Sequence, residues 1–467
     1  MASSRDQEHD AADQSMSFGR RARRSLARRF PRARHVYHSV LDTAKRLRSV
    51  PRQSVAARRF LRTCRDTARQ RQVDSRLTVG VDISPLWEPL TGVGWYLYRL
   101  LEHLADRDDV RIRLYPPTIF LSHQFPHGDP LVELPSGPAL EVVAYDLPDV
   151  LAVDHIAVNF VRRWEADLVR RDRNQVLFAP NYFLPRLFNR VPGALVATIH
   201  DLGFRKVPWT LREETLSSLA ERLDKTLTSA ALLITVSNTV RDELVSFGYA
   251  PRDQIRVVHH GAGLLEGIAA GALPSGVAAP FGLHVGTLEP RKNVSSLLAC
   301  WRLLRDQVPD LPPLVLCGRF GWKSQDLEAE VAAAEEEGWL LHLGYVPEDE
   351  LARLYAEAFV VVFPTLYEGF GLPAVEAMAA RTPLVCSDIP VLHEVAGEAA
   401  LFASPQQPEA MARQVRKVLT DDALRRELIS RGTARLEDFD WNKTAEETLA
   451  VWREAASSKN PSTDKVG

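Results

Sequence analysis

Cysteine is scarce in this chain. Its 467 residues include four, Cys64, Cys300, Cys317 and Cys386, and no two of them form a CxxC pair. This scarcity excludes a disulfide-rich secreted scaffold and a zinc module built on cysteine. It also favours a reducing compartment, so we expect the protein in the cytoplasm.

Long apolar segments are also missing. The longest stretch without Asp, Glu, Lys or Arg, residues 267–288, is interrupted by glycine and proline, which makes it a poor transmembrane span. Arg5, Asp6 and Glu8 stand where a signal peptide would have its apolar core. We therefore expect any membrane contact to be peripheral.

The net charge of −2 is an average over two unlike parts. Residues 1–76 contain 20 Lys and Arg against 7 Asp and Glu, a net charge of +13, so the remainder carries −15. Apolar residues recur within 18–72 at spacings of three and four, which predicts basic amphipathic helices. We interpret 18–72 as a contact to an anionic membrane surface, where each Lys or Arg contributes ~1 kcal/mol. A nucleic-acid-binding tail and a solvated extension are the alternatives, and we expect no nucleic-acid partner.

After residue 76, short apolar runs alternate with helical patterns. Runs of this kind are typical of strands whose two faces are both covered by helices, so the pattern indicates a doubly wound parallel α/β sheet. A connector rich in Gly, Ala and Pro over 264–280 interrupts the alternation near its middle. Strands are predicted at 77–83, 110–115, 194–199, 231–236 and 254–258, and after the connector at 281–287, 314–317, 340–343, 359–363, 384–387 and 400–403.

This interruption predicts two Rossmann-like domains in series that face a cleft, with the active site between them. We expect a partly disordered basic extension over 1–76, a first domain over 77–265, a second domain over 281–440 and a disordered tail over 457–467. In such sheets ligands bind beyond the carboxyl ends of the strands. The loops that follow the strands are therefore the places to search for chemistry.

The loop after the strand at 359–363 carries the strongest signal. Gly369 and Gly371 allow close approach of the backbone to a ligand, and Pro373 suits the first turn of a helix at 373–380. Free N–H groups at that turn favour an anion such as phosphate. Glu368 and Glu376 bracket the turn with carboxylates that can accept hydrogen bonds from sugar hydroxyls.

Two cations follow the strand at 281–287. Arg291 and Lys292 lie where a strand gives way to a helix and would donate to a diphosphate. Cations, a phosphate cradle and two carboxylates together suit a sugar nucleotide.

The run from Glu368 to Glu376, EGFGLPAVE, resembles the E-x7-E signature of retaining GT-B glycosyltransferases of family 4. Residues 285–293, VGTLEPRKN, resemble that family's donor-phosphate loop in the form common among bacterial mannosyltransferases. Matching short motifs stand in order at 92–94, 198–201, 235–237 and 344–346. The resemblance covers residues 77–456, and it implies that the helix at 441–456 crosses back to complete the first, acceptor-binding domain while 281–440 binds the donor.

Carried over by position, the resemblance assigns roles to individual residues. Lys292 and Arg291 would bind the donor diphosphate, Glu376 the ribose, Glu368 the transferred sugar, and His200 would face that sugar. His200, Lys292, Arg291 and Glu368 form the expected catalytic set. The other expected donor-binding residues are Gly92, Gly94, Gly286, Thr287, Tyr345, Val346, Gly369, Phe370, Gly371 and Leu372, and Asp201 and Trp95 are expected on the acceptor side.

Two positions depart from the family pattern. Thr287 stands where many relatives have Arg, so the cationic role rests on Arg291 and Lys292. His259-His260-Gly261 replaces the usual Asn-Gly loop.

The resemblance implies a retaining hexosyltransferase that needs no metal or cofactor. It favours mannose from GDP-mannose as the donor, and a glycan or polyprenyl-linked glycan as the acceptor, in polysaccharide or cell-surface glycan synthesis. With such an acceptor, the inner face of the membrane is the expected site of attachment. A UDP-hexose-dependent glucosyltransferase and a non-catalytic glycan- or nucleotide-binding relative are the alternatives.

Overall fold

The structure describes the whole of the predicted second domain and parts of the first. The computed structural model of the protein describes residues 75–87, 90, 92–115, 132–143, 169–170, 172–182, 184–185, 188, 191–262 and 271–458. The two sheets found there belong to one compact unit. Residues 18–72, predicted to contact a membrane, lie outside the described residues, as does most of the predicted tail. No helix in the described ranges combines the length and the apolar character that crossing a bilayer requires.

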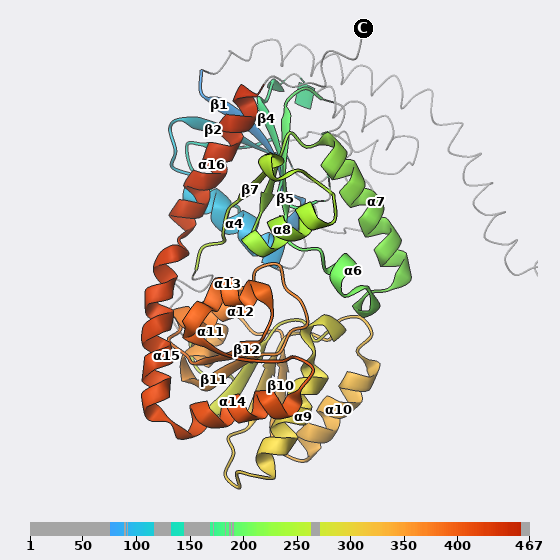
Figure 1. The fold of residues 1–467 in the computed structure, drawn as a ribbon. Coiled ribbons are helices and arrows are strands. Elements are labelled where there is room, and N and C mark those ends of the chain that lie inside the picture. The colour runs from blue at the N-terminus through green and yellow to red at the C-terminus, as the bar shows by residue number, and fades with distance from the viewer. Residues whose placement is uncertain are drawn as a thin grey trace, which may run out of the picture. The chain divides into compact units, whose positions relative to one another are not determined.

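The first sheet has seven strands in the order β3-β2-β1-β4-β5-β6-β7, and all neighbouring strands are parallel. Figure 1 shows this sheet with α4 and α16 on one side and α7 and α8 on the other. The elements are β1 (Leu77–Asp82), α4 (Gly92–Leu104), β2 (Val110–Tyr115), β3 (Leu140–Val142), β4 (Val176–Ala179), β5 (Ala194–Ile199), α6 (Gly203–Lys206), α7 (Glu213–Ser229), β6 (Leu232–Thr235), α8 (Asn238–Ser246) and β7 (Ile255–Val257).

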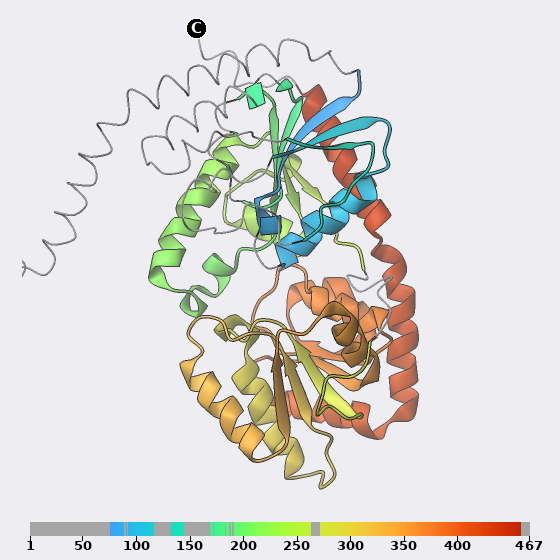
Figure 2. The same ribbon diagram turned by 180° about the vertical axis from the view of Figure 1, so that it is seen from behind.

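The second sheet has six parallel strands in the order β10-β9-β8-β11-β12-β13. Figure 2 shows it from behind with its surrounding helices. The elements are β8 (Phe281–Val285), α9 (Val294–Arg305), β9 (Leu314–Cys317), α10 (Gln325–Glu336), β10 (Leu340–Gly344), α11 (Glu348–Glu357), β11 (Ala358–Phe363), α12 (Leu372–Ala379), β12 (Leu384–Ser387), α13 (Pro390–Ala396), β13 (Ala400–Ala403), α14 (Pro408–Thr420) and α15 (Asp422–Arg435).

Strand β11 shows why its sequence is a continuous apolar run. Val361 and Phe363 belong to the hydrophobic cluster shared with α11, α12 and α13, whereas Val360 and Val362 belong to the cluster shared with α9, α10 and α14. Successive side chains of a strand point to opposite faces, so both faces of this strand are buried under helices. The predicted α/β fold class, with two Rossmann-like parallel sheets, is confirmed.

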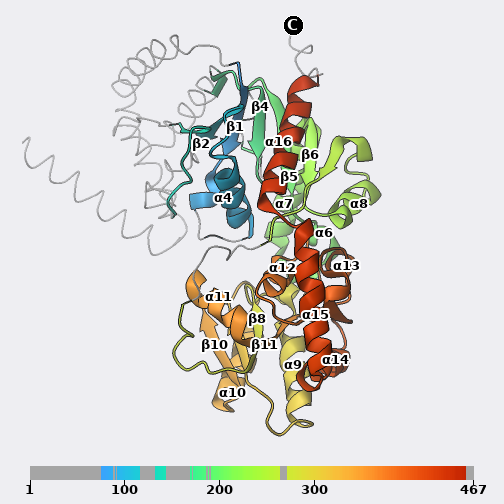
Figure 3. The same ribbon diagram turned by 90° about the vertical axis from the view of Figure 1, so that its left-hand side faces the viewer.

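Helix α16 (Trp441–Ser457) begins where Asp440 caps it by accepting a hydrogen bond from the Asn442 N–H. Trp441, Leu449 and Trp452 of this helix are buried in the core of the first domain, together with strands β1, β2, β4 and α4. Figure 3 shows α16 beside the first sheet and α15, which precedes it in the chain, beside the second. The C-terminal helix thus adds apolar surface to a domain whose other elements lie more than 180 residues earlier in the sequence.

Two strands of the first sheet are absent from the sequence-based prediction. Strand β3, Leu-Glu-Val, has three residues, none of them fully buried, and is too short to show the alternation or apolar run of a strand. Strand β4 has four apolar residues, all buried, and its run of Val, Leu, Phe and Ala is a signal that the prediction missed. The predicted strands at 110–115, 194–199, 314–317, 384–387 and 400–403 have the predicted bounds, and the others differ at their ends by one or two residues.

Candidate active site

A tight turn after β8 places the two predicted cations. Residues Pro290–Lys292 form one turn of 3-10 helix, and Asn293 follows in the left-handed conformation with φ 57°. The Asn293 side chain donates hydrogen bonds to the carbonyl oxygens of Pro364 (3.0 Å) and Pro405 (2.7 Å). These bonds tie the turn to the loop that follows β11. Arg291 and Lys292 are therefore held beside the loop that carries Glu368.

Glu368 is the centre of a buried ionic cluster. Its Oε1 atom lies 2.7 Å from Lys292 Nζ, 2.7 Å from Arg291 Nη1 and 2.9 Å from Thr365 Oγ1. Burial alone would raise the pKa of Glu368, but the charges of Arg291 and Lys292 outweigh it and lower that pKa to about 2. The carboxylate is thus ionised at neutral pH and fixes both cations in place. Glu289, also buried, accepts a hydrogen bond from Arg291 Nε at 3.0 Å.

The glycines of the EGFGLP loop lie in close contact with other parts of the protein. A Cβ atom on Gly369 would lie 1.7 Å from the carbonyl oxygen of His200, at the end of β5. Gly371 has a φ of 103°, and a Cβ atom there would lie 2.7 Å from Leu392. Ser237 Oγ donates to the Gly369 carbonyl at 2.7 Å. Residues of the first domain are therefore packed directly against this loop. Phe370, which belongs to the loop, is buried.

His200 lies at this junction. Its Nε2 atom is 2.7 Å from the carbonyl oxygen of Pro180, and its ring stacks on His260 at 5.5 Å. Burial lowers the pKa of His200, although the Pro180 carbonyl and the charge of Asp201 oppose the shift. The imidazole is therefore neutral at pH 7: Nε2 carries the proton and donates a hydrogen bond to the Pro180 carbonyl oxygen, and Nδ1 is the acceptor nitrogen.

Glu376 lies one turn inside α12 and is held by a tyrosine of α11. The hydroxyl of Tyr355, a fully buried residue, donates a hydrogen bond to Glu376 Oε2. Burial raises the pKa of Glu376, and the hydrogen bond from Tyr355 and the charge of Lys292 counteract part of that shift. Burial and the Glu376 charge raise the pKa of Tyr355 well above its ordinary value, so its hydroxyl keeps its proton and stays a donor.

Replacing Tyr355 with phenylalanine removes only this hydroxyl. A hydrogen bond to a charged group contributes ~1.5–3 kcal/mol, and we expect the Tyr355→Phe protein to bind a nucleotide-sugar donor about tenfold more weakly. Calorimetric titration with the donor measures the change. Tyr249→Phe, which removes a hydroxyl from a surface contact with Arg205, is the control and should bind as the unchanged protein does. Equal affinities for all three would show that Tyr355 does not orient Glu376.

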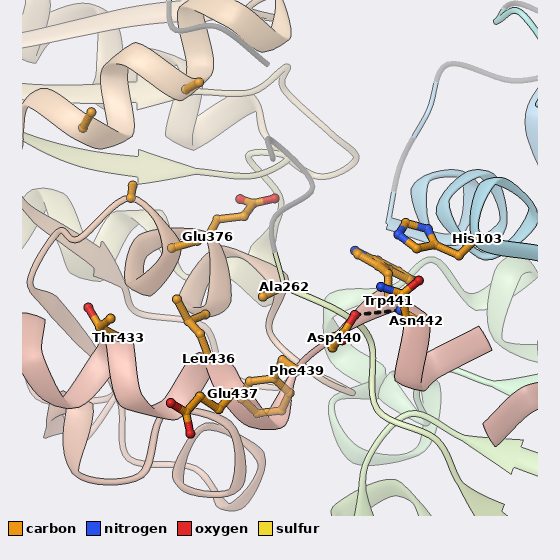
Figure 4. Close-up of a pocket in the computed structure, with 14 residues that line it drawn as sticks. His103, Ala262, Glu376, Thr433, Leu436, Glu437, Phe439, Asp440, Trp441 and Asn442 are labelled. Atoms are coloured by element: carbon orange, nitrogen blue, oxygen red, sulfur yellow. Dashed lines mark hydrogen bonds between the residues drawn. The ribbon is translucent and has the colours of Figure 1, made fainter. Parts of the chain in front are cut away.

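A cavity of about 770 Å³ lies beside Glu376. Figure 4 shows the Glu376 carboxylate pointing away from α12 toward the space in front of His103 and Trp441. His103 belongs to α4 and Trp441 to α16, so both domains contribute to the lining. Glu376, expected to bind the donor ribose, thus faces a cavity lined by elements of both domains.

Some of the other predicted site residues lie near the donor loop or are exposed, and the rest make contacts within the fold. Gly92 comes close to the donor loop, since a Cβ atom there would lie 3.6 Å from Leu372, and a Cβ atom on Gly286 would lie 3.5 Å from Lys292 Cε. Thr287 and Tyr345 are exposed, the latter beneath the guanidinium of Arg319 at 5.4 Å from its ring centre.

The remaining predicted site residues make contacts within the fold. Gly94 packs against Leu90, and Val346 is buried in the core of the second domain. Asp201 Oδ1 accepts a hydrogen bond from the Gly203 N–H at 2.8 Å at the start of α6, and Trp95 packs edge-on against Tyr98. Roles of all these residues toward a donor or acceptor stay predictions.

Some residues of the site were not predicted. Thr365 lies three residues before Glu368, and Glu289 lies within the run VGTLEPRKN, so their polarity after strand ends was a usable signal. Tyr367 is adjacent to Glu368, and its hydroxyl accepts from the Leu202 N–H at 2.9 Å and donates to Glu243 Oε2 at 2.7 Å. Tyr355 gave no signal, because it reaches Glu376 from another helix.

Two family models match this chain, one in each of its two domains. Residues 90–264 match the family described as Glycosyltransferase Family 4, and residues 274–435 match the family described as Glycosyl transferases group 1. The O-antigen chain mannosyltransferase B of Escherichia coli is 30% identical over 377 residues, which cover 79% of this chain and 97% of that protein. The O-antigen chain mannosyltransferase RfbU of Salmonella typhimurium is 25% identical over 253 residues, covering 54% of this chain and 67% of that protein.

Solved structures share the arrangement of the two domains at low sequence identity. Sucrose-phosphate synthase from Thermosynechococcus elongatus has a TM-score of 0.64 at 21% identity, covering 82% of this chain and all of that one. HepE from Anabaena, in complex with UDP and glucose, has a TM-score of 0.59 at 16% identity, covering 81% of this chain and all of that one. These likenesses concern the fold alone, which is GT-B. Because a relative of nearly full length is 30% identical and both halves match family models, the chain belongs to glycosyltransferase family 4.

Proposed function

We propose that this glycosyltransferase is a retaining mannosyltransferase that uses GDP-mannose. The observation that carries the proposal is the buried cluster in which Glu368 holds Lys292 and Arg291 at the ends of β8 and β11. The names of two relatives, both O-antigen chain mannosyltransferases, support mannose as the transferred sugar.

The leaving group determines what the cluster must do. As the bond between the sugar carbon and the diphosphate breaks, negative charge grows on the departing phosphate. Lys292 and Arg291 would stabilise that charge, and so would the N-terminus of α12, which no side chain among the described residues caps. Because all of these groups are fixed before the reaction, they need little reorganisation as the charge develops.

Retention follows from attack on the face that the diphosphate leaves. The acceptor hydroxyl oxygen bonds to the sugar carbon on that face, and its proton passes to the departing phosphate. His200, neutral and packed against Gly369, would face the sugar from the first domain. Two cations on the diphosphate supply the neutralising charge, and we therefore propose that transfer needs no metal.

For the acceptor we propose a glycan or polyprenyl-linked glycan, in keeping with the O-antigen relatives. Residues 18–72, rich in arginine, would hold the enzyme at the inner, anionic face of the membrane where such a lipid-linked acceptor is found.

A panel of donors tests the proposed function. We expect release of GDP from GDP-mannose in the presence of acceptor extract, at the same rate with EDTA, and an α-linked mannose in the product by NMR. UDP release from UDP-glucose instead would favour a glucosyltransferase. This is the second candidate function, because HepE, which has a similar fold, was solved with UDP and glucose bound. Release from no donor would favour a binding protein, and loss of activity in EDTA would contradict metal independence.

A further inference from the structure

Glu394 of α13 joins the second domain to the first helix turn of α8. Its Oε1 atom accepts from Asn238 N at 2.6 Å and Asn238 Nδ2 at 2.9 Å, and its Oε2 atom accepts from Thr239 N at 2.9 Å and Thr239 Oγ1 at 2.8 Å. A third residue of the first domain, His259, places Nε2 2.9 Å from Oε1. The carboxylate of one residue in the second domain therefore binds three residues of the first domain.

Backbone N–H groups at the start of a helix have no partner inside the helix. In α8, Ser237 Oγ accepts the Val240 N–H at 3.1 Å, and Glu394 accepts the two N–H groups before it. Burial would raise the pKa of Glu394, but the hydrogen bonds from His259, Asn238 and Thr239 lower it to about 2. The carboxylate is thus ionised at neutral pH, and the positive end of α8 stabilises it.

The residues that Glu394 binds adjoin those that touch the donor loop. Ser237 precedes Asn238 and donates to Gly369, and His260 follows His259 and packs edge-on against Phe370 at 4.9 Å. The ring of His260 also stacks on His200. Glu394 thus binds two segments of the first domain, and in each of them the neighbouring residue, Ser237 or His260, contacts the EGFGLP loop.

We infer that Glu394 is a positioning residue for sugar transfer: it fixes the first domain against the donor loop, so that His200 stands at a set place relative to Glu368. The inference rests on the proposed function. Glu394 itself contacts neither Lys292 nor Glu376 in the hydrogen bonds that the described residues form, so its action is on placement and not on donor affinity.

The test is Glu394→Gln, which keeps the shape of the side chain, removes its charge and presents an N–H₂ group to N–H donors. We expect kcat with GDP-mannose to fall by about 10²-fold, the effect of a displacement of roughly 1 Å at a reacting centre. The affinity for GDP, measured by calorimetry on the full chain, should stay unchanged. Hydrogen exchange at the amides of Asn238 and Thr239 should become faster. Thr239→Val, which removes a single hydrogen bond from the other side of the contact, should shift exchange and kcat in the same direction but less.

Glu398→Gln is the matched control. Glu398 lies four residues later and its side chain is 87% exposed, so the same charge is lost without a contact between the domains. Its turnover and exchange should equal those of the unchanged protein. Faster exchange in Glu394→Gln with unaltered kcat would overturn the positioning role, and a loss of GDP affinity as large as the loss of kcat would assign Glu394 to donor binding. An unchanged protein that releases no GDP from GDP-mannose would contradict the proposed donor, while the exchange data would still report on the contact itself.

Discussion

Replacing Lys292 with alanine is expected to lower turnover by about 10²–10³-fold, the usual effect of removing one fixed donor aimed at developing charge. The ammonium of Lys292 is buried beside Glu368, where water screens its charge little. The fold should survive, because Glu368 keeps its contacts with Arg291 and Thr365 after the substitution. The measurement is kcat for nucleoside-diphosphate release, with thermal unfolding to verify the fold.

Lys225→Ala is the control for this substitution. Lys225 is an exposed residue of α7 that pairs with Glu221 on the same helix, so its loss should leave turnover unchanged. Turnover of the Lys292→Ala protein close to that of the control would remove Lys292 from the catalytic set. In that case the guanidinium of Arg291, at the same distance from Glu368, would be the next residue to test.

The sequence predicted the fold wherever its signal was local. Val360 and Val362 face one helix layer and Val361 and Phe363 the other, and this double burial is what makes the strand a continuous apolar run. Strand β3 escaped prediction because it lies at the edge of the sheet, where part of its surface needs no apolar cover. The packing of Trp452 could not be derived from composition, since it depends on a helix that returns to strands far earlier in the chain.

The candidate site, too, was predicted where its signal was local and missed where it depends on contacts between distant segments. Lys292 and Glu368 were each predicted to follow a strand, at the carboxyl edge of a parallel sheet, and the structure places Lys292 Nζ 2.7 Å from Glu368 Oε1. Their mutual ion pair was not predicted. Glu394 lay beyond reach altogether, because its partners are 135 to 156 residues away and no local pattern distinguishes it from other helix carboxylates. The glycines at 369 and 371 were predicted to let the backbone approach a ligand, which stays a prediction, and the structure adds close contacts with His200 and Leu392 that no local pattern indicated.

Gly369→Ala is expected to lower turnover by at least about 10²-fold, because it must displace the backbone that carries His200. A methyl group at this position would lie 1.7 Å from the His200 carbonyl oxygen, far inside contact distance. A backbone oxygen at the end of a buried strand cannot rotate aside as a long side chain can, so the two segments must separate. The hydrogen bond from Ser237 Oγ to the Gly369 carbonyl would then lengthen as well.

Gly248→Ala separates this effect from backbone strain. Gly248 has a φ of 69°, which disfavours alanine, but a Cβ atom there would meet nothing within 4 Å. The control therefore bears a strain of roughly 1–2 kcal/mol without any overlap, and its turnover should remain near that of the unchanged protein. If Gly369→Ala also keeps its turnover while remaining folded, the junction between His200 and the donor loop can open without cost to the reaction, and the fixed placement of His200 is not part of catalysis.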